Sequence, residues 1–409
     1  SIQEFINNKL NSDITSLILK GTQFNSVETL EIIEQIESKK KCETKLPTWY
    51  AIERIYYPNK LNIEQTSSEI TAKHKSSLIS GNSIIDLTGG FGVDCYYFSK
   101  QFKNVTHCEI NDELHQIVKH NYKQLKSTNI NTILTDGIEY LKNCNTKYDW
   151  IYVDPSRRHD SKGKVFMLSD CLPNIPEHID LLFEHSKNVM IKTSPLLDIS
   201  IGINELKHVK TIHIVAINNE VKELLWVLEE NYNSKIELQT TNLKNEFTES
   251  FNFYLEDESN IVSNYSLPLT YLYEPNSAIL KAGAFNSVSK QLQVLKLHKH
   301  SHLYTNDEVI EFPGRCFKIE SVIAYNKKEL KDLNITKANI NSSGLLEDAE
   351  WSRSVEGRFE GAGTKTKRFS TSDLGDVTYG VRNPSADNYG VHDEEGTVVD
   401  SDTEPLYDN

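Results

Sequence analysis

The sequence predicts an α/β protein with a doubly wound parallel sheet, preceded by a helical segment and followed by smaller α+β parts. Between about residues 80 and 230, short apolar strands alternate with helix-length stretches, as in sheets whose parallel strands are joined by crossover helices. The first strand runs into a glycine-rich turn, and acidic residues stand at the ends of four successive strands. Because open α/β sheets bind ligands beyond the carboxyl ends of their strands, we expect the functional site there.

Six segments of this region have the apolar, β-branched composition of buried strands. They are residues 82–87, 104–110, 131–136, 148–154, 188–193 and 210–217. Residues 112–126, between the second and third strands, have the length of a helix, and we expect Asp112 as its N-cap. Residues 76–230 are therefore predicted to form one domain.

Residues 1–75 are predicted to be helical. Asn25 and Glu28 have the spacing of a capping box, and apolar residues recur at helical spacing after them. We expect the lysine run 39–41 at the end of this helix, where positive charge opposes the negative pole. The alternative for these lysines is an RNA-binding patch.

The chain after residue 230 changes character twice. Residues 231–340 contain short strands broken by polar residues together with helical stretches, which predicts one or two small α+β domains. Residues 341–409 contain no isoleucine and hold 15 acidic and 6 basic residues. This composition predicts an acidic, flexible tail.

Charge, cysteine content and hydropathy limit the classes of protein to which this chain can belong. The net charge is −14, but the 340 residues before the tail hold 43 acids and 38 bases, so a local basic patch remains compatible with nucleic acid. The six cysteines are scattered without ligand-like spacing, which predicts a reduced, cytoplasmic protein with no structural metal. No apolar run approaches the roughly 20 residues that a membrane span needs, so no membrane partner is expected.

The turn after the first strand has the composition of a cofactor-binding loop, since glycine lets the backbone approach a ligand that a Cβ would block. It consists of Thr88, Gly89, Gly90, Phe91 and Gly92. The dinucleotide pattern G-x-G-x-x-G would place its third small residue at Cys95, which departs from that pattern. A nicotinamide-dependent oxidoreductase is therefore the weaker alternative.

The acidic residues at the strand ends favour S-adenosylmethionine as the cofactor. Asp86 can bind its amino group, Glu109 its ribose hydroxyls and Asp136 its adenine edge, while Asp154 stands at the reaction centre. The structural alternative is that each carboxylate only caps the helix that follows it.

Four motifs carry a resemblance to a known family. They are "DLTGGFGVD" (86–94), "CEIND" (108–112), "TDG" (135–137) and "VDPSRR" (153–158). The chain resembles class I SAM-dependent methyltransferases, and more closely those with a ferredoxin-like insert and a C-terminal THUMP-like domain. The closer match rests on "LNIEQTSSEITAKHK" (61–75), "IKTSPLLDIS" (191–200) and "NNEVKELLW" (218–226), and the resemblance covers roughly residues 45–340.

The resemblance implies a Rossmann-like methyltransferase domain at 76–230, a ferredoxin-like accessory domain at 231–275 and a THUMP-like domain at 276–340. It implies a set of cofactor-binding residues, namely Asp86, Thr88, Gly89, Gly90, Gly92, Glu109 and Asp136, joined by Gln65, Ser67 and Ser68 from the segment before the sheet. In that segment Thr66 and Glu69 also have capping-box spacing, which is a purely structural reason for both.

The loop at Asp154 predicts the chemistry. An amino nitrogen on a nucleobase is a poor nucleophile, and a carboxylate and a carbonyl that accept its hydrogens would make it a better one. Asp154 supplies the carboxylate, and the backbone near Pro155 supplies the carbonyl. Amino-methylating enzymes commonly place a second proline and a base-stacking aromatic next, where this chain has Ser156 and Arg157.

Three basic residues near this loop are candidates for binding the substrate. Arg157 and Arg158 can stack on a base or bind a phosphate. Alternatively, one pairs with Asp154 or with the cofactor carboxylate while the other is solvated. Lys192 ends the fifth strand close by, where a substrate contact and a simple loop turn are both open.

The sequence thus predicts a SAM-dependent methyltransferase that modifies a nucleobase in RNA (rRNA or tRNA), with an amino nitrogen favoured, since THUMP domains bind RNA. Methylation of a protein or small molecule and a non-catalytic SAM- or RNA-binding module are the alternatives. His298, His300 and His302 alternate as on one face of a strand, too far apart for one zinc ion, so we expect a polar face and no metal.

Overall fold

The computed structural model describes residues 1–24, 26–157 and 167–322, together with short strands at 337–339, 368–370, 391–392 and 398–399. The chain divides into two compact units. Unit 1 comprises Ser1–Thr211 and Leu224–Ser234, and unit 2 comprises Ile212–Glu223 and Lys235–Asn409. Among the described residues no helix has the length and hydropathy of a membrane span.

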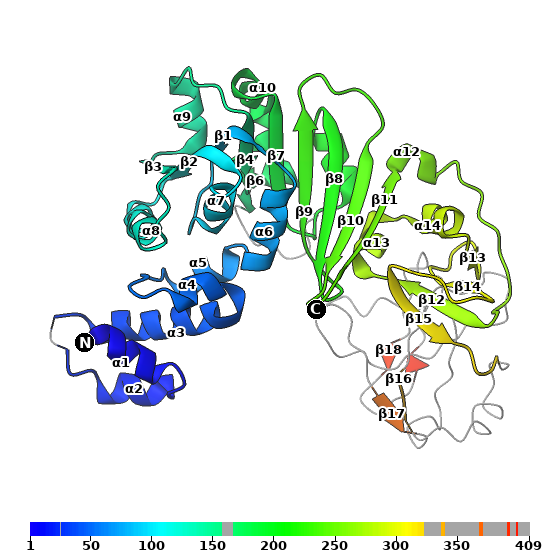
Figure 1. Cartoon of the computed structure of the whole chain (residues 1–409), viewed down its shortest axis with the longest axis horizontal. Coiled ribbons are helices and arrows are strands. Elements are labelled where there is room, and N and C mark those ends of the chain that lie inside the picture. Colours follow the sequence, from blue (N-terminus) through cyan, green and yellow to red (C-terminus); the bar gives the residue numbers. More distant parts are fainter. Residues whose placement is uncertain are drawn as a thin grey trace. The chain divides into compact units, whose positions relative to one another are not determined.

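Six helices precede the sheet (Figure 1). They are α1 (Ile2–Lys9), α2 (Ile14–Lys20), α3 (Thr29–Lys45), α4 (Pro47–Ala51), α5 (Lys60–Gln65) and α6 (Glu69–Ser77). The first three share a small apolar core that includes Ile6, Leu17 and Ile32. The last of these helices, α6, packs on α7, the first helix after β1.

Two details of α3 differ from the sequence prediction. Glu28 itself is the N-cap residue, and its side chain makes no capping bond, so the predicted capping box was wrong. The lysine run 39–41 lies inside α3, because the helix continues to Lys45. Lys39 is buried and donates to Asn7 Oδ1 at 2.7 Å, while Lys41 pairs with Glu64.

The main sheet has nine strands in the order β11-β10-β8-β9-β7-β4-β1-β2-β3. In unit 1 its strands are β1 (Gly81–Asp86), β2 (Phe102–Glu109), β3 (Ile130–Leu134), β4 (Trp150–Val153) and β7 (Asn188–Thr193). Neighbours among these five pair in parallel. The last three residues of β1 and of β4 and the middle of β7 are buried. The predicted α/β fold with a Rossmann-like sheet is confirmed, and each predicted strand lies within two residues of its place.

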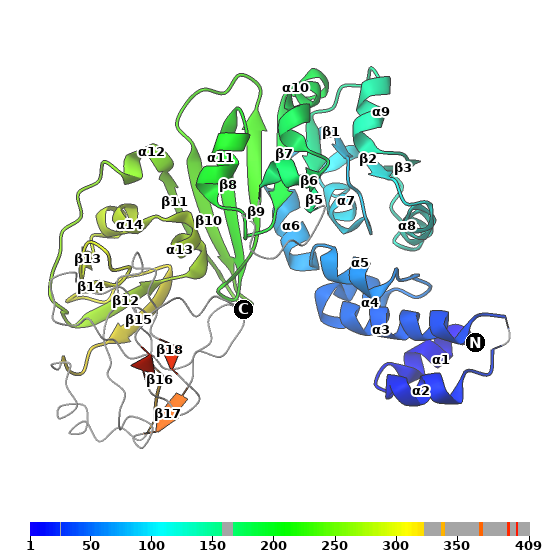
Figure 2. The ribbon, with the colours of Figure 1, turned by 180° about the vertical axis from the view of Figure 1, so that it is seen from behind.

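Crossover helices cover both faces of this sheet. They are α7 (Val93–Phe98), α8 (Asp112–Gln124), α9 (Gly137–Asn143), α10 (Ile175–His185) and α11 (Ile199–Glu205), with a 3-10 turn at Leu168–Asp170. Helices α6 and α7 pack together on the face toward the viewer in Figure 1, whereas α10 lies against β7 on the face seen in Figure 2. Asn111, not Asp112, caps α8, because its side chain accepts from Leu114 N at 2.9 Å.

The remaining strands of the main sheet are β8 (Val209–Ile217), β9 (Glu220–Glu229), β10 (Glu237–Leu243) and β11 (Thr248–Tyr254). The sequence placed residues 231–275 in a separate accessory domain, but β10 and β11 belong to the main sheet. The reason is their apolar content, since Leu238, Phe251 and Phe253 are buried. Antiparallel pairing of β7 with β9 begins this extension.

Unit 2 also holds a second sheet, with the strand order β13-β14-β12-β15. Its elements are β12 (Tyr271–Pro275), β13 (Leu295–Lys296), β14 (Tyr304–Asn306) and β15 (Gly314–Lys318), with α12 (Leu255–Glu258), α13 (Ser277–Ala282) and α14 (Phe285–Leu292). Two further strand pairs are β16 (Lys337–Asn339) with β17 (Arg368–Ser370) and β18 (Val391–His392) with β19 (Val398–Val399).

The three alternating histidines do not lie on a strand. His298, His300 and His302 fall between β13 and β14, and His302 stacks on Phe285 with ring centroids 3.7 Å apart. The predicted polar strand face was therefore wrong. The chain turns here because Ser301 N bonds to His298 O at 3.0 Å.

Candidate active site

The candidate site lies at the carboxyl edge of the main sheet within unit 1. Strands β1, β4 and β7 are adjacent, with Asp86 opposite Tyr152 and Val153 opposite Ile191. Asp154 follows β4 directly, and Lys192 is the next residue on β7 after Ile191. The register therefore brings the ends of three buried strands to one place.

Asp86 is a buried carboxylate without a cationic partner among the described residues. It is 1% exposed, and its Oδ1 accepts from Thr88 N at 2.9 Å while Cys95 Sγ donates to Oδ2 at 3.4 Å. Burial, with smaller contributions from the charges of Asp94 and Asp154, raises the pKa of Asp86 to about 7. Such a group favours a ligand that brings a positive charge.

Thr88 joins the ends of β1 and β4. Its hydroxyl donates to Asp86 Oδ1 at 3.3 Å and accepts from the backbone N–H of Asp154 at 2.7 Å. The sequence predicted Thr88 as a cofactor residue, whereas the contacts of its hydroxyl in the structure fix the position of Asp154 relative to Asp86.

The glycine turn is tightly constrained. A Cβ on Gly89 would lie 2.3 Å from the His107 ring, and one on Gly92 would lie 2.2 Å from Tyr122 Oη. Gly90 and Gly92 have φ of +53° and +79°, which favour glycine. Only at Gly90 is the added Cβ free of close contact, with its nearest neighbour 3.8 Å away. The turn is thus packed tightly against His107 and Tyr122, and it leaves free space only beside Gly90.

Glu109 ties this turn to the end of β2. Its Oε2 accepts from Gly90 N at 2.9 Å, and its Oε1 accepts from Asn111 N at 2.7 Å. Each carboxylate oxygen has capacity for a further bond. The carboxylate is therefore held in a fixed orientation in which it can still accept from hydroxyl groups.

Asp136 is the N-cap of α9. Its Oδ1 accepts from Ile138 N at 2.8 Å and from Glu139 N at 3.0 Å. The capping role considered for the acidic strand ends is thus present at Asp136, which is exposed. A contact with an adenine edge would have to use its other oxygen.

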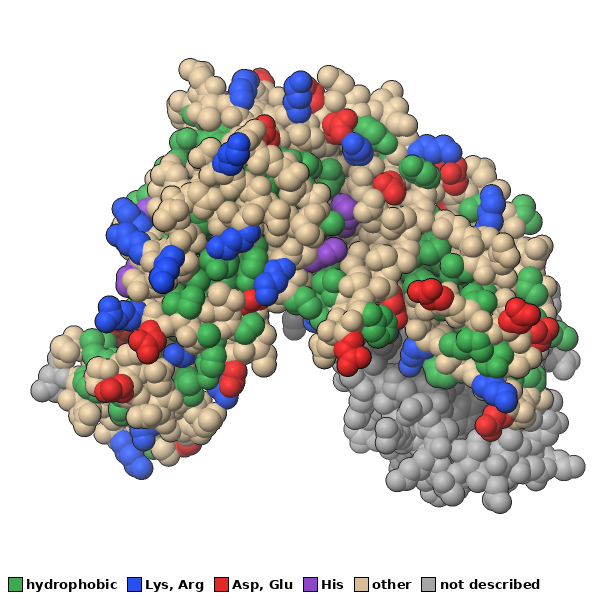
Figure 3. Space-filling model, in the orientation of Figure 1, with side chains coloured by type: hydrophobic (Ala, Val, Ile, Leu, Met, Phe, Trp, Pro, Cys, Tyr) green, Lys and Arg blue, Asp and Glu red, His purple; other side chains and the backbone are tan. Residues whose placement is uncertain are grey.

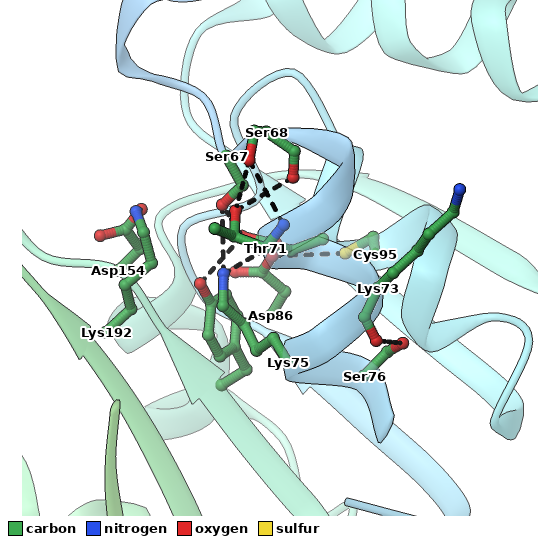
Figure 4. A network of polar contacts seen from close by, with 12 residues as sticks. Ser67, Ser68, Thr71, Lys73, Lys75, Ser76, Asp86, Cys95, Asp154 and Lys192 are labelled. Carbon is green, nitrogen blue, oxygen red and sulfur yellow. Dashed lines mark hydrogen bonds and ion pairs between the residues drawn. The ribbon is translucent and has the colours of Figure 1, made fainter. Parts of the chain in front are cut away.

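Asp154 and Lys192 form an ion pair at the reaction end of the sheet, visible at one side of Figure 4. The lysine side chain is 14% exposed and that of Asp154 is 32% exposed. The two side chains come from neighbouring parallel strands, so their pairing follows from the register of β4 and β7. The sequence predicted both residues for the site, but not the ion pair.

The loop after Asp154 is only partly described. Pro155 is buried, and Ser156 is exposed and pairs with Leu172 in a two-residue ladder between β5 (Ser156–Arg157) and β6 (Cys171–Leu172). Arg158 and the side chain of Arg157 lie outside the described residues. Their predicted contacts with substrate stay predictions.

A buried ion pair that the sequence reasoning missed lies behind the site. Lys75 on α6 is 0% exposed, and it donates to Asp94 Oδ1 at 2.9 Å and to Ser67 Oγ at 3.1 Å. Asp94 Oδ2 accepts from Ser67 Oγ at 2.8 Å and from Tyr152 Oη at 2.9 Å. Figure 4 shows Lys75 pointing from α6 toward Ser67. This network fixes α6 to the helix that follows the glycine turn.

The surroundings of Asp94 favour its ionised form. Burial alone would raise the pKa of Asp94, but the charges of Lys75 and Lys192 and the bonds from Lys75 and Ser67 outweigh it and lower that pKa. The only sequence signal for Asp94 was its place at the end of the motif "DLTGGFGVD".

The N-cap of α6 is a different residue from the one that the sequence predicted. Ser68 is the N-cap, accepting from Thr71 N at 3.3 Å, so the capping box of Thr66 with Glu69 was wrong. Glu69 instead accepts from Thr48 N at 2.8 Å. Gln65, at the end of α5, is exposed. Ser67 is buried in the network described above, and Ser68 is half-buried at the start of α6.

These residues fit the cofactor that the sequence predicts. The uncompensated carboxylate of Asp86 suits an ammonium group, the oriented carboxylate of Glu109 suits a pair of hydroxyls, and Gly90 leaves space in front of the turn. Cys95 occupies the third small position of the dinucleotide pattern, and its thiol is consumed by the bond to Asp86. The donor set therefore favours S-adenosylmethionine over a nicotinamide dinucleotide.

Comparison with known proteins gives a strong match over most of the chain. A crystal structure of a protein named "putative methyltransferase" from Porphyromonas gingivalis W83 is 33% identical, with a TM-score of 0.74, covering 81% of this chain and 84% of that chain. A family model described as a ferredoxin-like domain matches residues 271–313. This match overlaps the range 231–275 predicted for such a domain only at residues 271–275, and the THUMP-like assignment of 276–340 stays a prediction. No curated protein matches the chain.

Weaker likenesses cover smaller shares of the chain. One is the putative methyltransferase yhhF from Escherichia coli, at 18% identity and a TM-score of 0.30, covering 40% of this chain and 85% of that chain. Another is TrmK from M. capricolum in complex with S-adenosylhomocysteine, at 17% identity and a TM-score of 0.32, covering 40% and 69%. At these scores the likenesses carry no argument about function.

Proposed function

Because the chain belongs to the same methyltransferase family as the protein from P. gingivalis W83, we propose that it transfers a methyl group from S-adenosylmethionine to an amino nitrogen of an RNA nucleobase. The observation that carries this proposal is the carboxylate of Asp154. It stands at the end of β4, beside the glycine turn, and is fixed through Thr88 and Lys192.

In this proposal the cofactor is held by the residues around the glycine turn. Asp86 binds its ammonium group, Glu109 its ribose hydroxyls, and the backbone of Gly89, Gly90 and Gly92 lies along the amino-acid part. Asp136 contacts the adenine edge, while Gln65, Ser67 and Ser68 close the pocket from the α5–α6 segment. When bound, the sulfonium supplies an activated methyl group, so the protein needs mainly to align the acceptor and exclude water.

Asp154 and Pro155 act on the acceptor. A carboxylate oxygen of Asp154 and the carbonyl of Pro155 would accept the two amino hydrogens, which increases electron density on the nitrogen and stabilises the positive charge that develops there. Lys192 keeps the carboxylate oriented by its ion pair. Ser156, Arg157 and Arg158 follow at the mouth of the site, where we place contacts with the base and its phosphates.

The proposed acceptor follows from this chemistry. An amino group conjugated to a heterocycle needs its hydrogens polarised, whereas an aliphatic amine needs only to lose a proton. A carboxylate at the end of a strand, followed by a proline carbonyl, serves the first need directly. This is why a nucleobase amine is preferred to a protein lysine or a small aliphatic amine.

The test is transfer of labelled methyl groups onto fractionated RNA and protein from a strain that lacks the gene. We expect label in an RNA fraction, on an exocyclic nitrogen after digestion to nucleosides. Asp154→Ala should reduce the rate about 100-fold or more, the loss typical when one stabilising group for developing charge is removed. Label on protein alone, or on a base carbon, would contradict the proposed acceptor.

A further inference from the structure

Five lysines of unit 1 occupy stretches of sequence without acidic residues. Residues 95–108 and 114–135 contain five lysines and no aspartate or glutamate, in a chain of net charge −14. We call these five the α7–α8 lysine surface. They are Lys100, Lys103, Lys119, Lys123 and Lys126. All five are exposed, and within the described part of the chain none is in an ion pair.

The fold brings the five together. Lys100 lies in the turn that joins α7 to β2, and Lys103 is the second residue of β2. Lys119 and Lys123 lie on α8, and Lys126 follows its C-cap. Asn129 Nδ2 donates to Ser99 O and to Phe102 O, both at 2.9 Å, and so holds the turn after α8 against the turn after α7. Lys119 and Lys123 are four residues apart on α8, which places them on one face of the helix, and Lys126 follows directly after the C-cap residue Leu125.

An aromatic ring is part of this surface. Lys100 Nζ lies 4.1 Å from the centroid of the half-buried Tyr96 ring. The acids closest in sequence to the α8 lysines, Asp112 and Glu113, lie in the first turn of α8, at its opposite end. In Figure 3 this part of unit 1 shows blue basic side chains separated by green hydrophobic ones. Cationic side chains beside an aromatic ring are typical of surfaces that bind nucleic-acid strands.

The surface is remote from the reaction centre. Lys103 lies near the start of β2, whereas Glu109 ends the same strand at the carboxyl edge of the sheet. Six residues of extended strand separate the two by about 20 Å. A ligand that contacts both ends of β2 must therefore be long, as a polymer is. Because the lysines are exposed and outside ion pairs, a polymer that carries negative charge would bind there most favourably.

We propose that the α7–α8 lysine surface binds the phosphate backbone of the RNA substrate at a distance from the base that is methylated at Asp154. The inference rests on the proposed function and deepens it, because it makes the substrate an extended RNA. Each lysine that neutralises a phosphate releases counterions, so the logarithm of RNA affinity falls with the logarithm of salt concentration by about 0.7 per contact on single strands.

The test compares two variants that remove the same number of charges. The surface variant changes Lys100, Lys103, Lys119, Lys123 and Lys126 to Gln. The control variant changes five lysines of unit 1 that form ion pairs, namely Lys40, Lys41, Lys60, Lys142 and Lys207, to Gln. Binding of total RNA from a strain lacking the gene is measured between 50 and 200 mM salt. The rate of methyl transfer to that RNA and the affinity for SAM are measured separately for each variant.

We expect the surface variant to lose about 3.5 units of the salt slope, since five contacts at about 0.7 each are removed. Its KM for RNA should rise at least tenfold while kcat at saturating RNA and SAM affinity stay unchanged. The control variant should keep the wild-type slope. Equal losses in both variants would show that only net charge matters and would overturn the proposal.

The outcomes separate this inference from the proposed function. RNA that is methylated normally by the surface variant, with an unchanged salt slope, would overturn the lysine surface and leave the proposed function standing. Label that enters only protein would overturn both. Binding of the wild type to vesicles of anionic phospholipid in preference to RNA at the same salt would identify the surface with a membrane and would also overturn the inference.

Discussion

Two lysine–aspartate pairs of unit 1 differ in one respect that separates structure from function. In the pair of Lys75 with Asp94 the side chains are 0% and 10% exposed, whereas in the pair of Lys192 with Asp154 they are 14% and 32% exposed. Asp94 accepts hydrogen bonds from three buried donors, whereas Asp154 lies at the carboxyl end of the sheet and is more exposed. The enclosed ion pair thus fixes a helix, whereas the open pair leaves a carboxylate accessible, as the proposed function requires of Asp154.

The largest effect is expected from breaking the enclosed pair. Lys75→Met leaves the carboxylate of Asp94 buried without its cation, which costs about 3–5 kcal/mol of unfolding free energy. Urea denaturation measures this loss. The double variant with Asp94→Leu should recover part of it, because two apolar groups replace the buried pair. A loss below about 1 kcal/mol for Lys75→Met would show that the pair does not hold α6 in place.

Asp86 extends the comparison to a buried carboxylate that has no lysine partner among the described residues. Its pKa is about 7 in the folded protein against an ordinary value of 3.8. The folded state therefore binds this proton more tightly, and the stability from this group is present below pH 3.8 and is lost as the pH rises through 7. In the absence of cofactor, the unfolding free energy of Asp86→Asn relative to that of the wild type should therefore increase by about 1.4 kcal/mol per pH unit between those values.

Urea midpoints at pH 5, 6, 7 and 8 check this prediction. The same substitution should weaken SAM binding above pH 7, since the ammonium group loses its counter-charge. Parallel stability profiles for the two proteins would contradict the assignment of a raised pKa to Asp86.

The open pair should matter for catalysis and little for stability. Lys192→Met is expected to lower kcat by about 10- to 100-fold, the equivalent of one lost hydrogen bond to a charged group. Its unfolding free energy should change by less than about 1 kcal/mol, as for other partly exposed ion pairs. Lys192→Arg should retain much of the activity. A stability loss as large as that of Lys75→Met would erase the distinction between the two pairs.

Thr88 gives the smallest expected effect. Thr88→Val removes the hydroxyl that accepts from Asp154 N and should lower kcat about tenfold, with the SAM dissociation constant nearly unchanged. Thr88→Ser keeps the hydroxyl and should keep the rate. If SAM affinity fell and kcat did not, Thr88 would act on the cofactor, as the sequence alone predicted.

The sequence predicted the sheet and the site's carboxylates because both leave local signals. Apolar β-branched runs mark the strands, and Asp86, Glu109 and Asp154 stand where those runs end. The glycine turn was predicted as well, since its positive φ angles at Gly90 and Gly92 require glycine. These features depend on residues that are neighbours in the chain.

The features that the sequence missed depend on partners far apart in the chain. A lysine in a polar helix such as α6 looks exposed, and only the packing of α6 against α7 buries Lys75 beside Asp94. Helix caps failed for a different reason. Several neighbouring residues can cap the same helix, so Ser68 replaced Thr66 and Asn111 replaced Asp112.

The central claim is that Asp154 acts on the acceptor and not on the cofactor. The most direct measurement compares SAM affinity and single-turnover methyl transfer to RNA for the wild type and Asp154→Ala. We predict a SAM dissociation constant within about threefold of the wild type and a transfer rate lower by about 100-fold or more. A variant that loses SAM affinity and transfers methyl groups at the wild-type rate once saturated would contradict the claim.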